Sequence, residues 1–336
     1  MSSHLPLIDS VAWRPLERSD APLCTDLWNA CFEADGGYRM VEEEWVQELA
    51  DPDDDPSQDG VIAIHDDGSA VAVAFVQIPP ATSLWRAAGW GAVRPDHRGR
   101  GIGSAVHSWR EARATERLLE MPDDLAKFHW ETLYDTQQEQ VAFFVDRGYR
   151  PVRHWFEMTR ELSKPIVAAA LDPALALVAY EPTMAEATRQ ANNDSFRDHW
   201  GSQPVTEERW RRYYVGGDSF RADLSSVVMD GDDVVGLLLA GCFPHDFEDK
   251  GRTEVWADII GTRRGYRNRG IASALIVDWM ERVAAAGYQY AILGVDSASK
   301  TGALGLYERH GFQLDKSSTS YGKPVAGSDW SALEIA

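Results

Sequence analysis

Arginine, glycine and small residues lie together at residues 267–273, between a segment expected to be a strand and one expected to be a helix. The first backbone N–H groups of a helix have no partner within it, and the helix dipole is positive at that end. Glycine and alanine let a ligand approach the backbone, while arginine adds positive charge. The segment therefore predicts a binding site for a diphosphate group. The residues assigned to it are Arg267, Asn268, Arg269, Gly270, Ile271, Ala272 and Ser273.

The same pattern occurs 169 residues earlier, where residues 98–104 read RGRGIGS. A second matched pair follows, because residues 143–149 (FFVDRGY) resemble residues 306–312 (LYERHGF) at an offset of 163. Two landmarks in the same order at nearly the same spacing indicate duplication of a whole domain, since solenoid repeats are much shorter. A second diphosphate site is predicted in the first copy. Its assigned residues are Arg98, Arg100, Gly101, Gly103 and Ser104.

Two other nucleotide-binding loops do not fit these segments. The dinucleotide pattern G-x-G-x-x-G fails because the second copy keeps one glycine, Gly270. The triphosphate loop G-x-x-x-x-G-K-[ST] does not occur in the sequence. A simple turn rich in arginine and glycine is the remaining alternative, and its recurrence before a second landmark argues against it.

Each half has the alternation of strands and helices that is typical of an α/β domain. Strands are expected at 11–16, 62–64, 70–78, 85–93, 127–133, 175–180, 225–229, 234–240, 255–260 and 290–295, and helices at 102–119, 138–146, 183–193, 271–286 and 302–309. Polar residues and prolines between 161 and 175 mark a boundary. The predicted domains are residues 1–163 and 174–336.

Composition excludes several classes of protein. The chain of 336 residues has 33 basic and 53 acidic residues, a net charge of −20, which disfavours nucleic acid and anionic membranes as partners. That charge suits a cationic small molecule, although solubility is the favoured explanation for it. Three cysteines at no metal-binding spacing indicate a reduced, cytoplasmic protein without a metal site. We find no membrane-spanning run and no secretory signal in the sequence.

The loop pattern, together with TGALGLYERHGF at residues 301–312, resembles the GCN5-related N-acetyltransferase (GNAT) superfamily. The doubled arrangement is similar to its mycothiol-synthase-like two-domain members. The resemblance implies an α/β (α+β) fold of two tandem GNAT domains, each with a mixed, twisted sheet that splays open between two strands and is flanked by helices. Acetyl-CoA would lie in that opening as the cosubstrate. Residues implied to bind it also include Ile259, Ile260, Gly261 and Ser299, the last standing where the family often has asparagine.

The resemblance also implies the chemistry, in which a primary amine of a small molecule attacks the thioester directly. Tyr307 occupies the position of the tyrosine that protonates the departing thiolate. Glu254 and Asp258 alternate on one strand and are the candidate bases. Asp258 is preferred because it lies nearer the opening, and an aspartate in an otherwise apolar segment is not readily explained as structural, whereas Glu254 could be a solvated strand residue. The alternative function is a non-catalytic protein that binds or senses acyl-CoA.

The first copy lacks this equipment. Phe144 replaces the tyrosine, and residues 85–93 contain no carboxylate. The first domain is therefore predicted to bind CoA without turnover, or to shape the acceptor pocket. Residues 198–201 (DHWG) and Trp210 lie where the family builds its acceptor wall, although Trp210 is predicted to be core. The protein is expected to be a monomer or a homodimer.

Overall fold

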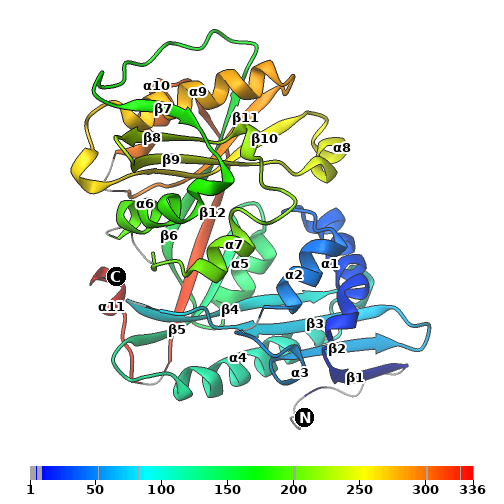
Figure 1. The fold of residues 1–336 in the computed structure, drawn as a ribbon. Helices are drawn as coiled ribbons and strands as arrows, with labels where there is room; N and C mark the ends of the chain where they lie inside the picture. The colour runs from blue at the N-terminus through cyan, green and yellow to red at the C-terminus, as the bar shows by residue number, and fades with distance from the viewer. Residues whose placement is uncertain are drawn as a thin grey trace. The chain divides into compact units, whose positions relative to one another are not determined.

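The expected strands and helices are present in the computed structural model, which describes residues 5, 10–51, 53–81, 83–197, 199, 202–299, 302–325 and 327–335. The chain forms two compact units (Figure 1). Unit 1 comprises Met1–Val152 and Thr319–Ala336, and unit 2 comprises Arg153–Ser318. Each unit is a mixed sheet covered by helices, as the sequence predicts.

Unit 1 has the strand order β1-β2-β3-β4-β5-β12, in which β4 and β5 are parallel. Helix α4 packs on one face of the sheet, and α1 and α2 pack on the other. Its elements are β1 (Val11–Pro15), α1 (Ala21–Asp35), α2 (Glu42–Leu49), α3 (Pro56–Asp59), β2 (Gly60–His65), β3 (Ala70–Gln77), β4 (Leu84–Val93), α4 (Ile102–Glu120), β5 (Ala126–Tyr134), α5 (Gln138–Val145), the end of β12 (Gln313–Pro324) and α11 (Ala332–Ile335).

Unit 2 repeats this plan with the order β6-β11-β10-β9-β8-β7, in which β10 and β11 are parallel. Its elements are β6 (Arg150–Glu161), β7 (Ala176–Ala179), α6 (Ala185–Phe196), α7 (Glu207–Tyr213), β8 (Ser226–Asp230), β9 (Asp233–Gly241), α8 (Phe247–Lys250), β10 (Glu254–Thr262), α9 (Ile271–Ala285), β11 (Tyr290–Asp296) and α10 (Ala303–Arg309). No helix in the described ranges is both long enough and apolar enough to cross a membrane.

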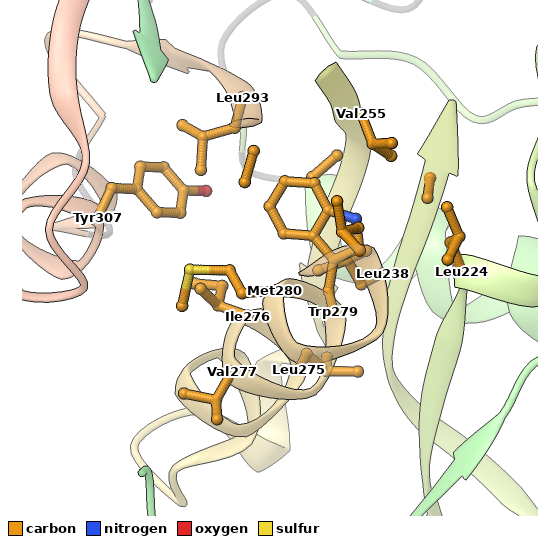
Figure 2. Close-up of a cluster of buried hydrophobic side chains, with 14 of the residues drawn as sticks. Leu224, Leu238, Val255, Leu275, Ile276, Val277, Trp279, Met280, Leu293 and Tyr307 are labelled. Carbon is orange, nitrogen blue, oxygen red and sulfur yellow. The ribbon is translucent and has the colours of Figure 1, made fainter. Parts of the chain in front are cut away.

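The core of unit 2 explains why α9 forms where it does. Leu275, Trp279 and Val283 recur at helical spacing and are fully buried, as the sequence predicts. They pack with Leu238 of β9 and Leu293 of β11 on one face of the sheet (Figure 2). Helices α6 and α7 cover the opposite face, because Leu237, Leu239 and Ile259 pack with Trp210 in a separate cluster.

The last strand of each repeat extends into the other unit, β6 over most of its length and β12 over its second half. Strand β6 ends the first repeat, yet it pairs antiparallel with β11 from Tyr290↔Glu161 to Asp296↔Trp155. The end of β12 lies in unit 1, where the Val325 N–H donates to the carbonyl oxygen of Lys127 over 2.9 Å. The predicted ranges 1–163 and 174–336 thus follow the sequence repeat, whereas the compact units exchange a strand.

Candidate active site

Strands β10 and β11 separate partway along their length. Their parallel pairing ends at Ala257↔Leu293. Beyond that point β10 pairs only with β9, as far as Thr262↔Gly236, and β11 pairs only with β6, as in Gly294↔Glu157. The edge of β10 that carries Ile259, Ile260 and Gly261 therefore faces an opening. Backbone groups on such an edge are available to hydrogen-bond a ligand.

A β-bulge places Asp258 beside this opening. The register of β10 against β9 shifts between Ala257 and Ile259, so Asp258 is the extra residue. Its carboxylate lies over Gly241, where a Cβ atom would be 2.2 Å from Oδ2. Ala240 and Cys242, the neighbours of Gly241 on β9, face α9, so the Cβ position of Gly241 faces α6 and α7. Asp258, which lies over Gly241, is therefore on the α6/α7 face of the sheet.

Asp258 has the properties expected of a general base. Within the described part of the chain, its carboxylate makes no hydrogen bond and no ion pair. The side chain keeps solvent access, yet protein atoms crowd around it, and this loss of hydration raises its pKa to about 7. A carboxylate with that pKa can take up and release protons near neutral pH.

Glu254 is placed differently. Its side chain is only 2% exposed, and its two oxygens accept from Lys250 Nζ at 2.6 Å and from Arg252 Nε at 2.8 Å. The alternative of a solvated strand residue is therefore wrong. The residue lies before the bulge, on the stretch of β10 that still pairs with β11. Two cations already occupy its oxygens, so the geometry favours a structural role over proton transfer.

Tyr307 of α10 lies in the core on the α9 face, close to the end of the β10–β11 pairing. Its side chain is directed toward Leu293, the last residue of β11 that pairs with β10 (Figure 2). The residue is 7% exposed, packs edge-on against Phe312 at 6.2 Å, and makes no hydrogen bond within the described part of the chain. Burial raises the pKa of the phenol to about 12, so it stays protonated at working pH.

Glu157 is a carboxylate that the sequence analysis missed. It lies on β6 opposite Gly294, which is exposed and has no atom within 4 Å of an added Cβ. Glu157 shares the α6/α7 face with Asp258, because its neighbour Met158 packs toward α9. Burial raises its pKa. No local signal could have found it, since β6 is not among the expected strands and lies about a hundred residues before β10.

The arginine–glycine loop of unit 2 has the geometry of an anion site. Asn268 and Gly270 have φ angles of 64° and 78°, and the first helical bond of α9 runs from the Ala274 N–H to the Gly270 carbonyl. The N–H groups before Ala274 thus have no partner in the helix. These belong to Ile271, Ala272 and Ser273. Arg267 donates to the carbonyl oxygen of Ser195 at 2.8 Å, so it ties the loop to α6.

Residues 166–172, which connect β6 to β7, cross this loop. The backbone oxygen of Ala170 would lie 2.2 Å from a Cβ atom on Gly270. The Asp172 N–H donates to the Arg269 carbonyl at 3.3 Å, and Arg269 Nε pairs with the Asp172 carboxylate at 2.8 Å. We call this segment the strap.

The loop of unit 1 has the same backbone form and is open. Gly101 caps α4 at φ 82°, and among the described residues no atom lies within 4 Å of an added Cβ there or at Gly99. Arg98 forms two bonds of 2.7 Å with Asp35 of α1, and Arg100 donates to the Asp96 carbonyl. The remaining assigned residues follow on the first turn: Gly103, and Ser104, which accepts from Arg147 at 2.8 Å.

The two capping glycines give a first prediction. Alanine at either Gly270 or Gly101 should cost about 1–2 kcal/mol, because both have left-handed φ angles. Only Gly270→Ala also meets a backbone atom, which adds roughly 1–3 kcal/mol of overpacking. Scanning fluorimetry should show a larger fall in melting temperature for Gly270→Ala than for Gly101→Ala. Equal falls would contradict the contact with the strap.

The remaining assignments fall around unit 2. Ser299 is half-buried in the turn between β11 and α10. Asp198, Trp200 and Gly201 lie outside the described residues. Trp210 is 1% exposed and stacks on Tyr214 at 4.9 Å, which confirms that it is core. Among the described residues, no group of three His, Cys, Asp or Glu side chains is arranged to hold a metal ion.

Unit 1 lacks both candidate catalytic groups. Its strands β4 and β5 also stop pairing, at Ala87↔His129. Gly89 is the counterpart of Asp258 when both strands are counted back from their loop arginines. Phe144 packs edge-on against His107 at 5.3 Å, where unit 2 has Tyr307. The two units thus share the form of the opening, but not its chemistry.

Comparison with known proteins agrees with this geometry. Residues 185–312 match the acetyltransferase (GNAT) family. A GCN5-related N-acetyltransferase from Sphaerobacter thermophilus is 26% identical over 97% of this chain and 98% of its own, with a TM-score of 0.73. A tandem GNAT protein from the clavulanic acid biosynthesis pathway is 13% identical over 95% of this chain and 100% of its own, with a TM-score of 0.67.

The glucosamine N-acetyltransferase region of a fungal multi-domain β-N-acetylglucosaminidase also has this fold. It is 16% identical over 93% of this chain and 38% of that protein, with a TM-score of 0.65. No curated protein matches the sequence. The doubled loop, the doubled opening and these similarities lead to one conclusion: residues 185–312 form a domain of the acetyltransferase (GNAT) family, and the chain as a whole has the fold of tandem GNAT proteins.

Proposed function

We propose that the protein transfers an acetyl group from acetyl-CoA to a primary amine of a small molecule, and that unit 2 performs the reaction. The observation that carries this proposal is Asp258, a carboxylate at the opening between β10 and β11 that makes no hydrogen bond or ion pair with the described residues and has a pKa of about 7. Tyr307 lies on the other face of the sheet, with its side chain directed toward Leu293, where the pairing of β11 with β10 ends. Unit 1 has neither group.

In the proposed reaction, Asp258 accepts a proton from the substrate ammonium, which frees the nitrogen lone pair. The amine attacks the thioester carbonyl, so a C–N bond forms while the C–S bond breaks. The nitrogen loses its second proton to solvent, and the departing sulfur takes one from the Tyr307 hydroxyl. Solvent then reprotonates the phenol. The products are an amide and CoA, with one net proton released from the ammonium substrate.

The donor would be held mainly by backbone groups. The free N–H groups of Ile271, Ala272 and Ser273 suit a diphosphate, and the unpaired edge of β10 suits the amides of its pantetheine arm. Arg267 would act by positioning the loop, because its guanidinium bonds Ser195. Acetyl-CoA is proposed here as the family's usual donor.

The acceptor is proposed to be cationic. Asp258 and Glu157 are two carboxylates without ion-pair partners in the described part of the chain, and both face the α6/α7 side of unit 2. The net charge of −20 also favours the approach of cations. We further propose a cytoplasmic protein, monomeric or homodimeric, that uses no metal, nucleic acid or membrane.

Screening amines for CoA release tests the proposal. Release of free thiol from acetyl-CoA, dependent on one class of amine, would support it. Tight binding of acetyl-CoA without release across a broad panel would instead support a sensing protein. Mass spectrometry of the product identifies the acetylated nitrogen and rules out simple thioester hydrolysis.

Arginine substitutions give a second prediction, about which unit holds the reacting donor. Arg267→Ala removes the tie between the loop and α6, so KM for acetyl-CoA should rise by roughly tenfold with little change in kcat. Arg98→Ala breaks the bidentate pair with Asp35. It should lower stability and leave turnover nearly intact. Steady-state kinetics of both variants with the same amine test this prediction. Loss of turnover in Arg98→Ala, with normal kinetics in Arg267→Ala, would assign the chemistry to unit 1.

A further inference from the structure

The arginine–glycine loops of the two units are similar in sequence but differ in the residues that contact them. The loop of unit 1 is open at Gly99 and Gly101. The loop of unit 2 carries the strap, residues 166–172, whose Ala170 carbonyl touches Gly270 and whose Asp172 pairs with Arg269. Arg100 is the counterpart of Arg269, and within the described part of the chain it pairs with no carboxylate.

The strap is held along its length. Arg160 of β6 donates to the carbonyl oxygens of Lys164 and Pro165, just before the strap begins. Three apolar side chains then pack against the core of unit 2. They are Ile166, Ala169 and Leu171. At its end, the Asp172 carboxylate accepts from the Ala174 N–H at 3.0 Å as well as from Arg269.

The groups that the strap presents to the loop are electron-rich. A carbonyl oxygen and a carboxylate lie where the helix dipole and Arg269 would otherwise attract an anion. The pKa of Asp172 is lowered by the Ala174 N–H and by Arg269, so the carboxylate is ionised at neutral pH. A diphosphate that uses Arg269 must compete with this internal anion.

We propose that the strap is an intramolecular competitor for the donor site of unit 2, with Asp172 standing in for a phosphate oxygen at Arg269. This inference rests on the proposed donor site and adds its regulation. Binding of acetyl-CoA displaces Asp172 from Arg269 and loosens residues 170–175. The strap is part of the connection between β6 and β7, so its release gives this connection more conformational freedom.

Hydrogen exchange of the full chain reads this release directly. The Asp172 amide bonds Arg269 and the Leu175 amide bonds Asp172, so both report on the strap. Saturating acetyl-CoA should slow exchange in residues 267–275 and speed it in residues 166–175. Slower or unchanged exchange in residues 166–175, with residues 267–275 protected, overturns the strap proposal and leaves the donor site standing. No protection at 267–275 overturns both.

A substitution tests the competition itself. Asp172→Asn keeps the turn to Ala174 but removes the charge opposite Arg269. Loss of an ion pair of this exposure should tighten acetyl-CoA binding about two- to fivefold. Affinity is measured as the acetyl-CoA concentration at which residues 267–275 reach half of their full protection. The matched control is Asp278→Asn, since Asp278 pairs with Arg282 at 2.7 Å within helix α9 and with similar exposure. Equal affinities for the two variants overturn the proposal.

Discussion

Replacing Asp258 with asparagine is expected to lower kcat/KM for acetyl transfer by roughly a hundredfold or more, the usual range for loss of a general base. The same change is expected to raise the melting temperature above neutral pH. Asparagine fills the same space over Gly241 but cannot accept the proton of the ammonium substrate. A variant that loses activity while gaining stability has lost a functional group, because damage to the fold would lower both.

The direction of the stability change follows from the pKa. An aspartate in the unfolded chain has a pKa of about 3.9, and Asp258 in the folded chain has one of about 7. Between these values the folded protein binds the proton more strongly, so stability falls as pH rises from about 4 to 7 and stays reduced above. The Asp258→Asn variant carries no such penalty. Melting temperatures of the two proteins should therefore coincide near pH 4, diverge as the pH rises to about 7 and differ by a constant amount above it.

The pH dependence of activity should run opposite to that of stability. The base works only when ionised, so kcat/KM of the parent protein should rise through pH 7 and level off above it. The Asp258→Asn variant should lack this rise. Assays of CoA thiol release between pH 5 and 9 measure the pH dependence of kcat/KM for both proteins. Glu254→Gln is a control for disturbance of the buried ion pairs at the start of β10.

Glu157→Gln separates the two carboxylates on the α6/α7 face. As a residue that attracts the acceptor's positive charge, Glu157 should affect KM for the amine and leave the rise near pH 7 in place. Loss of that rise in Glu157→Gln, with the rise retained in Asp258→Asn, would transfer the role of base to Glu157.

Local signals in the sequence predict the parts of the site that depend on short segments. The spacing of Leu275, Trp279 and Val283 predicts the α9 helix, and all three are buried. Glycine and arginines predict the loop before it, and the structure gives Gly270 the left-handed φ that such a cap requires. The hairpin of β8 and β9 follows from the turn at residues 230–233.

Features that depend on pairing between distant segments are not predictable in this way. Strands β6 and β12 are rich in polar residues and are only partly buried, so neither shows a clear alternation of apolar residues. The exchange of these strands between the repeats could therefore not be predicted from the sequence. The bulge at Asp258 depends on the register of β10 against β9, and the strap depends on packing against Gly270. A local pattern determines neither feature.

The second large effect is expected for Tyr307→Phe, which removes one oxygen atom and recreates the residue type found at Phe144 in unit 1. The hydroxyl makes no hydrogen bond within the described part of the chain, so its removal should leave stability and the Kd for acetyl-CoA nearly unchanged. Turnover should fall by roughly a hundredfold, because the departing sulfur loses its proton donor.

The raised pKa of Tyr307 is compatible with this role. A phenol with a pKa of about 12 stays protonated throughout the working range and can donate a hydrogen bond to developing negative charge. A thiolate that forms beside this buried phenol loses hydration too, which raises its affinity for the proton. The phenol thus stabilises the sulfur as the C–S bond breaks, and the fall in kcat should be similar at every pH in the assay range.

Tyr180→Phe is the matched control, because Tyr180 is also buried in unit 2, at 5% exposure, but packs in the cluster on the α6/α7 face. It should retain full turnover. Adding Phe144→Tyr to the Tyr307→Phe variant should not restore activity, since Gly89 of unit 1 offers no carboxylate where unit 2 has Asp258. If Tyr307→Phe were silent and the Phe144→Tyr change raised turnover, the reaction would belong to unit 1, and the open loop at Gly101 would be the one that holds the reacting donor.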